Sequence, residues 1–158
     1  MKTFVIAEVG SCHDGNLEVA FRLIRLANQV GADAVKFQWL SSAERLVERR
    51  HAPEYLQAYK LIQFPREWLD RLKACADHEG IEFMCTVYLP EDIEVIAPYV
   101  YRFKVASFEA QDEEFLLAHP NKPMIISHGM VEETLSPEIR LLSERVQVDY
   151  LHCVSAYP

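Results

Sequence analysis

Polar side chains interrupt a series of short apolar runs in this chain, each near the carboxyl end of its run. Lys36 and Gln38 lie two residues apart, so both would point to the same face of a strand. Lys104 follows another apolar run, and an ammonium group inside a protein must meet a carboxylate or an anionic ligand. The complete set is Glu8, Lys36, Gln38, Thr86, Lys104, Ser107, Ser127, His152 and Ser155. A helix cap or a solvated strand end explains any one of them equally well, but a polar ending on every run favours a shared site.

The residue types in this set suit a small anion. Lysine supplies positive charge, whereas Ser, Thr and Gln supply hydrogen-bond donors of defined geometry, so together they describe a cradle for phosphate and carboxylate groups. Glu8 and Glu109 add carboxylates that could serve ligand hydroxyls, proton transfer or pairing with lysine. The residue types therefore predict an anion bound beside acid–base groups and do not name a reaction.

Short apolar runs alternate with helical patterns along the chain, which is typical of repeated βα units and a parallel sheet. The first run is nearly continuous and predicts a strand covered on both faces. Asn16 predicts the start of the first helix and Gly31 its end, and Pro65 and Gly80 do the same for a later helix. A charged insertion over residues 41–63 is predicted to be partly helical. The predicted strands are residues 3–9, 34–38, 81–86, 101–106, 123–127 and 148–154.

This alternation fits either a (β/α)8 TIM barrel or an open doubly wound sheet. The doubly wound fold predicts a glycine-rich phosphate turn after the first strand. Residues 10–15 do not match G-x-G-x-x-G, so the barrel is favoured. A barrel has eight strands and typically about 250 residues, and its active site lies at the carboxyl ends of the strands. We therefore predict an α/β fold in which residues 1–158 form one domain and supply about six βα units of a TIM barrel.

The composition excludes some classes of binding partner and indicates the cellular compartment. A net charge of −8 argues against binding nucleic acid or an anionic membrane surface, which need a basic footprint. No apolar run approaches the roughly 20 residues of a membrane span, and the first residues do not resemble a signal peptide. The four cysteines lie far apart without a C-x-x-C spacing, so free thiols in a cytoplasmic protein are the better interpretation.

Two rival sites can be drawn from the histidines and cysteines. His13, His128 and His152 could bind a metal at the strand ends, although no pair of them has a ligand spacing such as H-x-x-x-H. Cys12 and Cys153 each adjoin a histidine, which suggests a Cys–His nucleophile. Adjacent residues of a strand point to opposite faces, so such a pair would have to form across the barrel, and buried thiols are the better default.

The same residues carry a resemblance to the N-acetylneuraminate (sialic acid) synthase family. Five sequence blocks match the family in order and at its approximate spacing over the whole chain. They include Ala7-Glu8-Val9-Gly10, Phe103-Lys104-Val105-Ala106-Ser107 and the terminal block that begins His152-Cys153. The five blocks are residues 7–10 with 13–15, 31–38, 103–107, 125–127 with 129–130, and 152–158.

The resemblance implies a transferase that condenses phosphoenolpyruvate with an N-acetylated amino sugar such as N-acetylmannosamine, giving a nonulosonic (sialic-type) acid. It implies a divalent cofactor, Mn²⁺ or Mg²⁺, and a homo-oligomer, a dimer in the full-length form. The implied phosphoenolpyruvate site is Lys36, Thr86, Lys104, Ser107, Ser127 and Ser155. The implied sugar site is Glu8, Gln38, Glu109 and Tyr157. Of these residues the catalytic candidates are Glu8, Lys36, Lys104 and Glu109; the others are candidates for binding substrate.

Departures from the family pattern affect the branch and the metal site. Ser127-His128-Gly129, Ser155 and Cys85-Thr86-Val87-Tyr88 lean toward the spore-coat-polysaccharide-synthase-like branch. The resemblance places both metal-binding histidines of the family beyond Pro158, so no metal ligand is expected in this chain. Two alternatives stay open. One is a non-catalytic barrel that binds a small anion, and the other is a different phosphoenolpyruvate aldolase such as the deoxy-octulosonate phosphate synthases. The Glu8 block and the terminal block argue against the latter.

Overall fold

The structure, a computed structural model, describes residues 3–129 and 137–154. The chain divides into two compact units, Met1–Cys85 and Thr86–Pro158. In each unit the strands follow chain order in the sheet, β1-β2-β3 in the first and β4-β5-β6 in the second. The predicted α/β class with strands in chain order is confirmed. The prediction of a single domain concerns both units together and stays a prediction.

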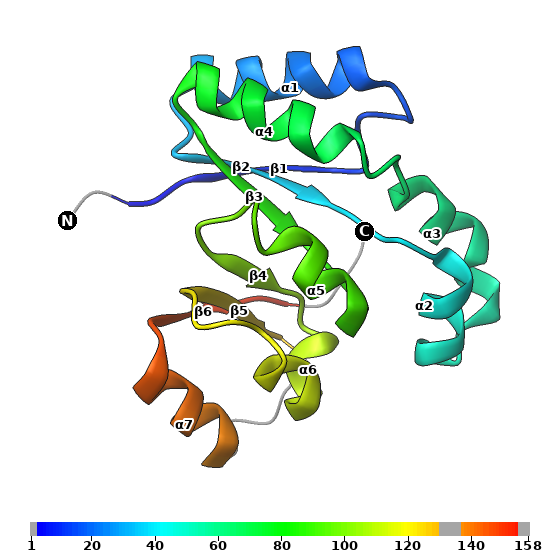
Figure 1. The fold of residues 1–158 in the computed structure, drawn as a ribbon, viewed down its shortest axis with the longest axis vertical. Coiled ribbons are helices and arrows are strands. Elements are labelled where there is room, and N and C mark those ends of the chain that lie inside the picture. Colours follow the sequence, from blue (N-terminus) through cyan, green and yellow to red (C-terminus); the bar gives the residue numbers. More distant parts are fainter. Residues whose placement is uncertain (1–2, 130–136, 155–158) are drawn as a thin grey trace. The chain divides into compact units, whose positions relative to one another are not determined.

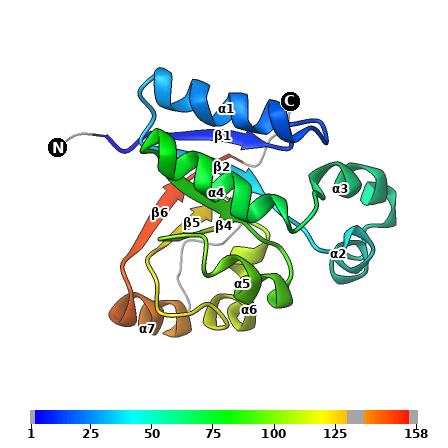
Figure 2. The same ribbon diagram turned by 45° about the horizontal axis from the view of Figure 1, so that its top comes forward.

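In the first unit a helical layer covers the strands. Its elements are β1 (Ile6–Gly10), α1 (Leu17–Gln29), β2 (Ala34–Gln38), α2 (Ala43–Arg50), the 3-10 turn η1 (Pro53–Tyr55), α3 (Leu56–Ile62), α4 (Trp68–Glu79) and β3 (Glu82–Thr86). Helices α1 and α4 lie side by side over β1 and β2 (Figures 1 and 2). The predicted apolar stripes make this core, since Ile24 on α1 and Leu72 on α4 are completely buried.

The helix boundaries of this unit follow the cap residues, with one shift. The Asn16 side chain accepts hydrogen bonds from the backbone N–H groups of Glu18 (2.9 Å) and Val19 (3.3 Å), so it caps α1 as predicted. Gly80 ends α4 in the left-handed conformation. Helix α4 begins at Trp68 and not at Pro65, because the N–H of Trp68 first closes a tight turn onto the Pro65 carbonyl.

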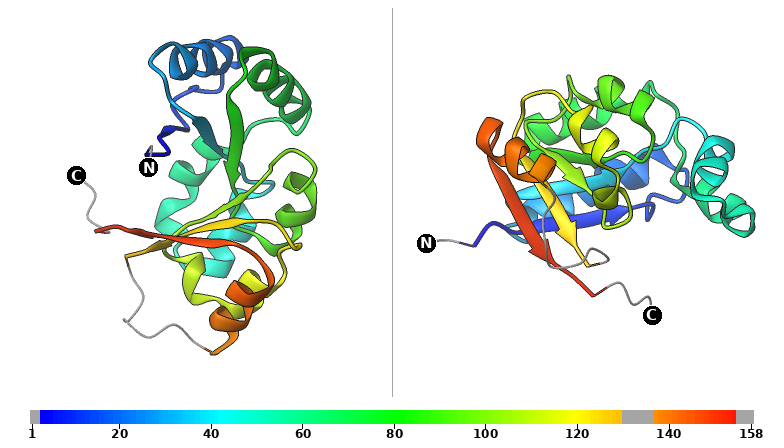
Figure 3. Two further views of the ribbon diagram at one scale, coloured as in Figure 1. Left: turned by 90° about the vertical axis from the view of Figure 1, so that its left-hand side faces the viewer. Right: turned by 90° about the horizontal axis from the view of Figure 1, so that it is seen from below.

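In its described residues the second unit has three short α-helices and the strands β4, β5 and β6, paired in that order. Its elements are α5 (Pro90–Ile96), β4 (Phe103–Val105), the 3-10 turn η2 (Glu109–Gln111), α6 (Glu113–Leu117), β5 (Met124–His128), α7 (Pro137–Arg145) and β6 (Val148–His152). β4 pairs in parallel with β5, and β5 with β6 (Figure 3). Lys122 holds the end of α5 by donating to the carbonyls of Ala97 (2.6 Å) and Val100 (2.7 Å).

The first strand differs from its prediction. Phe4 and Val5 are exposed and precede β1, and within β1 only Val9 and Gly10 are buried. The prediction of a strand covered on both faces is therefore wrong for β1. Among the described residues of its unit, β1 pairs with β2 alone. The apolar composition of this segment predicted a strand correctly but did not predict whether that strand is buried.

Apolar exposure at β6 predicts self-association. Leu151 is 41% exposed and Val154 is 78% exposed, beside a strand that pairs only with β5 in the described part of the unit. Open strand edges with apolar side chains recruit other chains. We expect residues 1–158 to sediment as oligomers and a Leu151→Lys/Val154→Lys variant to sediment closer to the monomer.

The matched control for this experiment is Leu26→Lys/Val30→Lys. These two residues are equally apolar and exposed, but they lie at the end of α1, where there is no strand edge. A monodisperse wild-type chain, or equal relief of association by both variants, would contradict the prediction.

Candidate active site

In the first unit Glu8 and Lys36 face each other across two strands. They are register partners of β1 and β2, and the Lys36 ammonium forms an ion pair with Glu8 Oε2. Lys36 is buried, whereas the Glu8 side chain is 51% exposed. The carboxylate thus meets the buried lysine on one side and solvent on the other. The sequence suggested that Glu8 could bind ligand hydroxyls, transfer a proton or pair with a lysine. The structure shows the pairing with a lysine.

Gln38 and Gly10 complete this group, which we call the Glu8 cluster (Glu8, Gly10, Lys36 and Gln38). A Cβ atom on Gly10 would lie 3.4 Å from Glu8 Oε1 and 3.5 Å from Gln38 Oε1, so both oxygens converge above this glycine. Gly10 has a positive φ of 54° and lies at a register irregularity of β1. The cluster therefore presents a carboxylate, an ammonium and an amide at the carboxyl ends of β1 and β2.

The loss of unfolding free energy on substituting Gly10 is expected to increase with the size of the new side chain. Gly10→Ala and Gly15→Ala should each lose about 1–2 kcal/mol of unfolding free energy, because both glycines have positive φ. Gly10→Met should lose more than Gly10→Ala, since the longer chain displaces the Glu8 and Gln38 oxygens. Gly15→Met should match Gly15→Ala, because nothing lies within 4 Å of a Cβ there. Urea unfolding of the four variants checks this, and an equal Met-minus-Ala difference at the two positions refutes it.

His13 lies buried behind the Glu8 cluster in an aromatic cage. Its ring contacts Phe37, Phe64 and Trp68 at centroid distances of 6.4, 5.4 and 5.8 Å. Nδ1 accepts a hydrogen bond from the Gly15 N–H (3.1 Å), so a neutral ring carries its proton on Nε2. Burial lowers the pKa of His13, against a smaller opposing effect of Asp14. His13 thus holds the loop after β1 in place as a neutral ring.

In the second unit the ammonium of Lys104 is enclosed by oxygens. Lys104 is 8% exposed, and its Nζ donates to Ser127 Oγ and to the Val105 carbonyl, each at 2.6 Å. Thr86 is buried and is the register partner of Lys104. Both of these acceptors, a hydroxyl oxygen and a backbone carbonyl, are neutral. That these residues bind an anion stays a prediction.

Ser107 brings in a residue that the sequence analysis did not place at the site. Ser107 Oγ lies 3.1 Å from Cys153 Sγ, and both residues are half-buried. We call Thr86, Lys104, Ser107, Ser127 and Cys153 the Lys104 cluster. Cys153 follows β6 directly, at the carboxyl end of a strand, where the other members of the cluster also lie, and that position was a usable signal. Cys153 was weighed only as half of a Cys–His nucleophile and was set aside because a buried thiol was the better default.

The remaining candidates fall in three places. Glu109 lies on η2 after β4 and is completely buried, so it does not face solvent in this structure. His128 and His152 are register partners on β5 and β6, and the His128 ring contacts Tyr150. Ser155 and Tyr157 lie outside the described residues.

Neither a metal site nor a membrane span is seen in the described part of the chain. No three or more His, Cys, Asp or Glu side chains gather there as potential ligands. No helix in residues 3–129 or 137–154 has the length and apolar character to cross a membrane.

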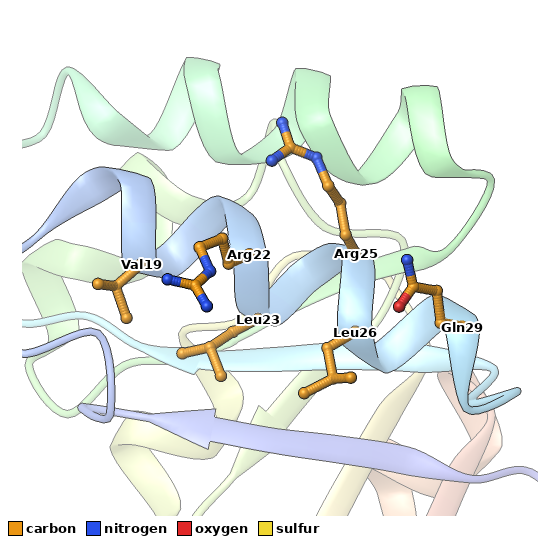
Figure 4. Close-up of a pocket in the computed structure, with 6 residues that line it drawn as sticks. All are labelled: Val19, Arg22, Leu23, Arg25, Leu26 and Gln29. Carbon is orange, nitrogen blue, oxygen red and sulfur yellow. The ribbon is translucent and has the colours of Figure 1, made fainter.

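A surface hollow of about 460 Å³ lies away from these candidates, along one face of α1 (Figure 4). Val19, Leu23 and Leu26 give it an apolar floor, and Arg22 and Arg25 border it. No candidate residue lines it, so the Glu8 and Lys104 clusters, and not this hollow, define the candidate chemistry.

Parallel βα units with polar side chains at the carboxyl ends of their strands define an α/β fold of the barrel class. The structural comparison supports that class. A sialic acid synthetase of Leptospira borgpetersenii matches with a TM-score of 0.80 and 27% identity, over all of this chain and 56% of that one. The predicted barrel fold is thereby confirmed. A truncated heptulosonate phosphate synthase of Thermotoga maritima, 15% identical with a TM-score of 0.64, shares the fold alone.

The chain belongs to the NeuB family, whose profile matches residues 23–158. The pseudaminic acid synthase of Campylobacter jejuni is 34% identical over 99% of this chain and 51% of its own length. The N,N'-diacetyllegionaminic acid synthase of Legionella pneumophila is 34% identical over 100% of this chain and 50% of its own. The chain thus spans about half the length of these relatives.

The family resemblance is confirmed, whereas the branch is not resolved. The spore coat polysaccharide biosynthesis protein SpsE of Bacillus subtilis is 33% identical, which is no nearer than the two synthases above. Human N-acetylneuraminate-9-phosphate synthase is 29% identical. The assignment of this chain to the spore-coat-polysaccharide-synthase-like branch stays a prediction.

Proposed function

We propose that this chain carries the phosphoenolpyruvate-binding part of a nonulosonic acid synthase. The reaction joins the enol carbon of phosphoenolpyruvate to the aldehyde carbon of an N-acetylated amino sugar. Water adds at the neighbouring carbon, and inorganic phosphate leaves. The observation that carries the proposal is the Lys104 ammonium, buried and bonded to Ser127, in a chain of the NeuB family.

Each cluster has its own role in this proposal. Lys104, Ser107, Ser127 and Thr86 bind the phosphate and carboxylate of phosphoenolpyruvate, because an ammonium with neighbouring hydroxyls gives charge-assisted hydrogen bonds. Lys36 adds a second positive charge that Glu8 orients. Glu8 and Gln38 receive the sugar hydroxyls at the open side of their cluster. Ser155 and Tyr157 are proposed to bind phosphoenolpyruvate and sugar, respectively, and Glu109 to act near the sugar.

The divalent cation that the resemblance implies would polarise the aldehyde as a Lewis acid. The described residues of this chain do not fit it, since no group of three ligands is present among them. We therefore derive no step through the cation and propose that its ligands come from outside these residues. A cytoplasmic location and a homo-oligomeric full-length form also belong to this proposal.

Two measurements test the proposal. Calorimetry with phosphoenolpyruvate and with inorganic phosphate reports binding by the 158-residue chain. Phosphate release is then measured with Mn²⁺ and a panel of acceptors, N-acetylmannosamine and di-N-acetylated amino sugars, for this chain alone and for a longer polypeptide of relatives' length. Binding here and turnover in the longer form are expected. Binding without turnover in either form would favour the non-catalytic alternative, and absence of binding in both would refute the proposal.

A further inference from the structure

The contact between Ser107 and Cys153 joins the ends of two strands that are not neighbours. Ser107 follows β4 and Cys153 follows β6, and β5 pairs with both strands between them. Adjacent strands lie about 4.8 Å apart, so β4 and β6 are separated by roughly 10 Å. Two short side chains can come within 3.1 Å over that gap only on a face toward which the strands curve.

Strand register identifies that face. Lys104 pairs with Ile125 and Ser127 pairs with Leu151, and register partners share a face of the sheet. Ile125 and Ser127 lie two residues apart, as do Leu151 and Cys153, so alternation places all of them on one face. The face is that of Lys104, whose ammonium binds Ser127. Cys153 is therefore on the anion-binding side of the second unit.

A thiol at this position can set the direction of the Ser107 hydroxyl. A serine oxygen accepts as well as donates, and a cysteine S–H is a weak donor. When the Cys153 thiol donates to Ser107 Oγ, it fills one acceptor position of that oxygen. The hydroxyl proton then remains available to a ligand on the side of Lys104 and Ser127.

We propose that Cys153 is a positioning residue that orients the Ser107 hydroxyl toward a bound phosphate or carboxylate oxygen. The inference rests on the proposed function, because the ligand is phosphoenolpyruvate. It assigns no chemistry to the thiol itself. Cys153 acts only through Ser107, which makes the two residues thermodynamically coupled.

A double-mutant cycle measures that coupling. We expect Cys153→Ala to weaken phosphoenolpyruvate binding about fivefold and Cys153→Ser to restore most of the affinity, because a hydroxyl also donates. In a Ser107→Ala background the Cys153→Ala change should cost less than twofold. Cys12→Ala is the matched control, since this exposed thiol lies in the other unit. Thermal melting of each variant checks that it folds.

A second measurement needs no substitution. Phosphoenolpyruvate should slow alkylation of Cys153 several-fold in the wild-type chain and leave alkylation of Cys12 unchanged, as followed by mass spectrometry. The inference fails if the wild type binds phosphoenolpyruvate but Cys153→Ala costs the same with and without Ser107. It also fails if Cys153→Ser gives no rescue. No binding by any form would instead overturn the proposed function and the inference with it.

Discussion

Lys104→Met is expected to weaken phosphoenolpyruvate binding by about tenfold to a hundredfold. The substitution keeps the length of the side chain and removes the ammonium that donates to Ser127 and Val105. Hydrogen bonds to a charged group contribute about 1.5–3 kcal/mol, and each 1.4 kcal/mol is about a factor of ten in affinity. Isothermal titration calorimetry of both proteins with phosphoenolpyruvate gives the ratio.

Lys122→Met is the control for that experiment. Lys122 is a half-buried lysine of the second unit, and its ammonium donates to two carbonyls at the end of α5. Its loss should lower stability and leave anion affinity unchanged. If both variants bind as tightly as the wild type, or both lose affinity equally, Lys104 does not have the role assigned to it.

The protein is expected to lose about 3 kcal/mol of unfolding free energy through His119 as the pH falls from 6.5 to 4. His119 is buried against Phe103 and Phe115, and its Nδ1 bonds the Phe115 carbonyl at 2.9 Å. Burial lowers the pKa of His119 to about 4, from an ordinary value of 6.5. Between these values the unfolded chain binds the proton and the folded chain does not, so acid favours unfolding.

The measurement is urea unfolding at several pH values for the wild type and for His119→Phe, which keeps an aromatic ring in the same surroundings. The carboxylates titrate in both proteins, so the difference between the two curves isolates His119. His78→Gln, at an exposed histidine on α4, serves as the control substitution. Because burial also lowers the pKa of His13, a loss in the same direction should persist in His119→Phe. Parallel pH profiles of wild type and His119→Phe would show the prediction to be wrong.

Local signals predicted the elements well, because each depends on a few adjacent residues. Asn16 and Gly80 marked helix boundaries through their own backbone preferences, and alternation placed Lys104 and Ser127 at strand ends. Such signals could not predict contacts between residues that are far apart in the sequence. The bond between Ser107 and Cys153 depends on how β4, β5 and β6 curve together, and no local pattern encodes that curvature.

The same limit explains the errors of the sequence analysis. The apolar run of β1 predicted burial, but burial depends on what else packs against the strand. His13 was considered as a metal ligand because the sequence shows an imidazole at this position but does not show which side chains surround it. Only packing brings Phe64 and Trp68 onto the ring, and the resulting apolar cage suits a neutral histidine.

The register irregularity of β1 has a consequence for how this chain can vary in length. Glu8 pairs with Lys36 and Gly10 with Phe37, so Val9 is a spare residue in the ladder. That extra residue lets Glu8 stay opposite Lys36 while the following loop still delivers His13 to its aromatic cage. Removing or adding a residue between Glu8 and His13 would force the chain to give up one contact or the other. Length variation should therefore be absent from this stretch in functional relatives.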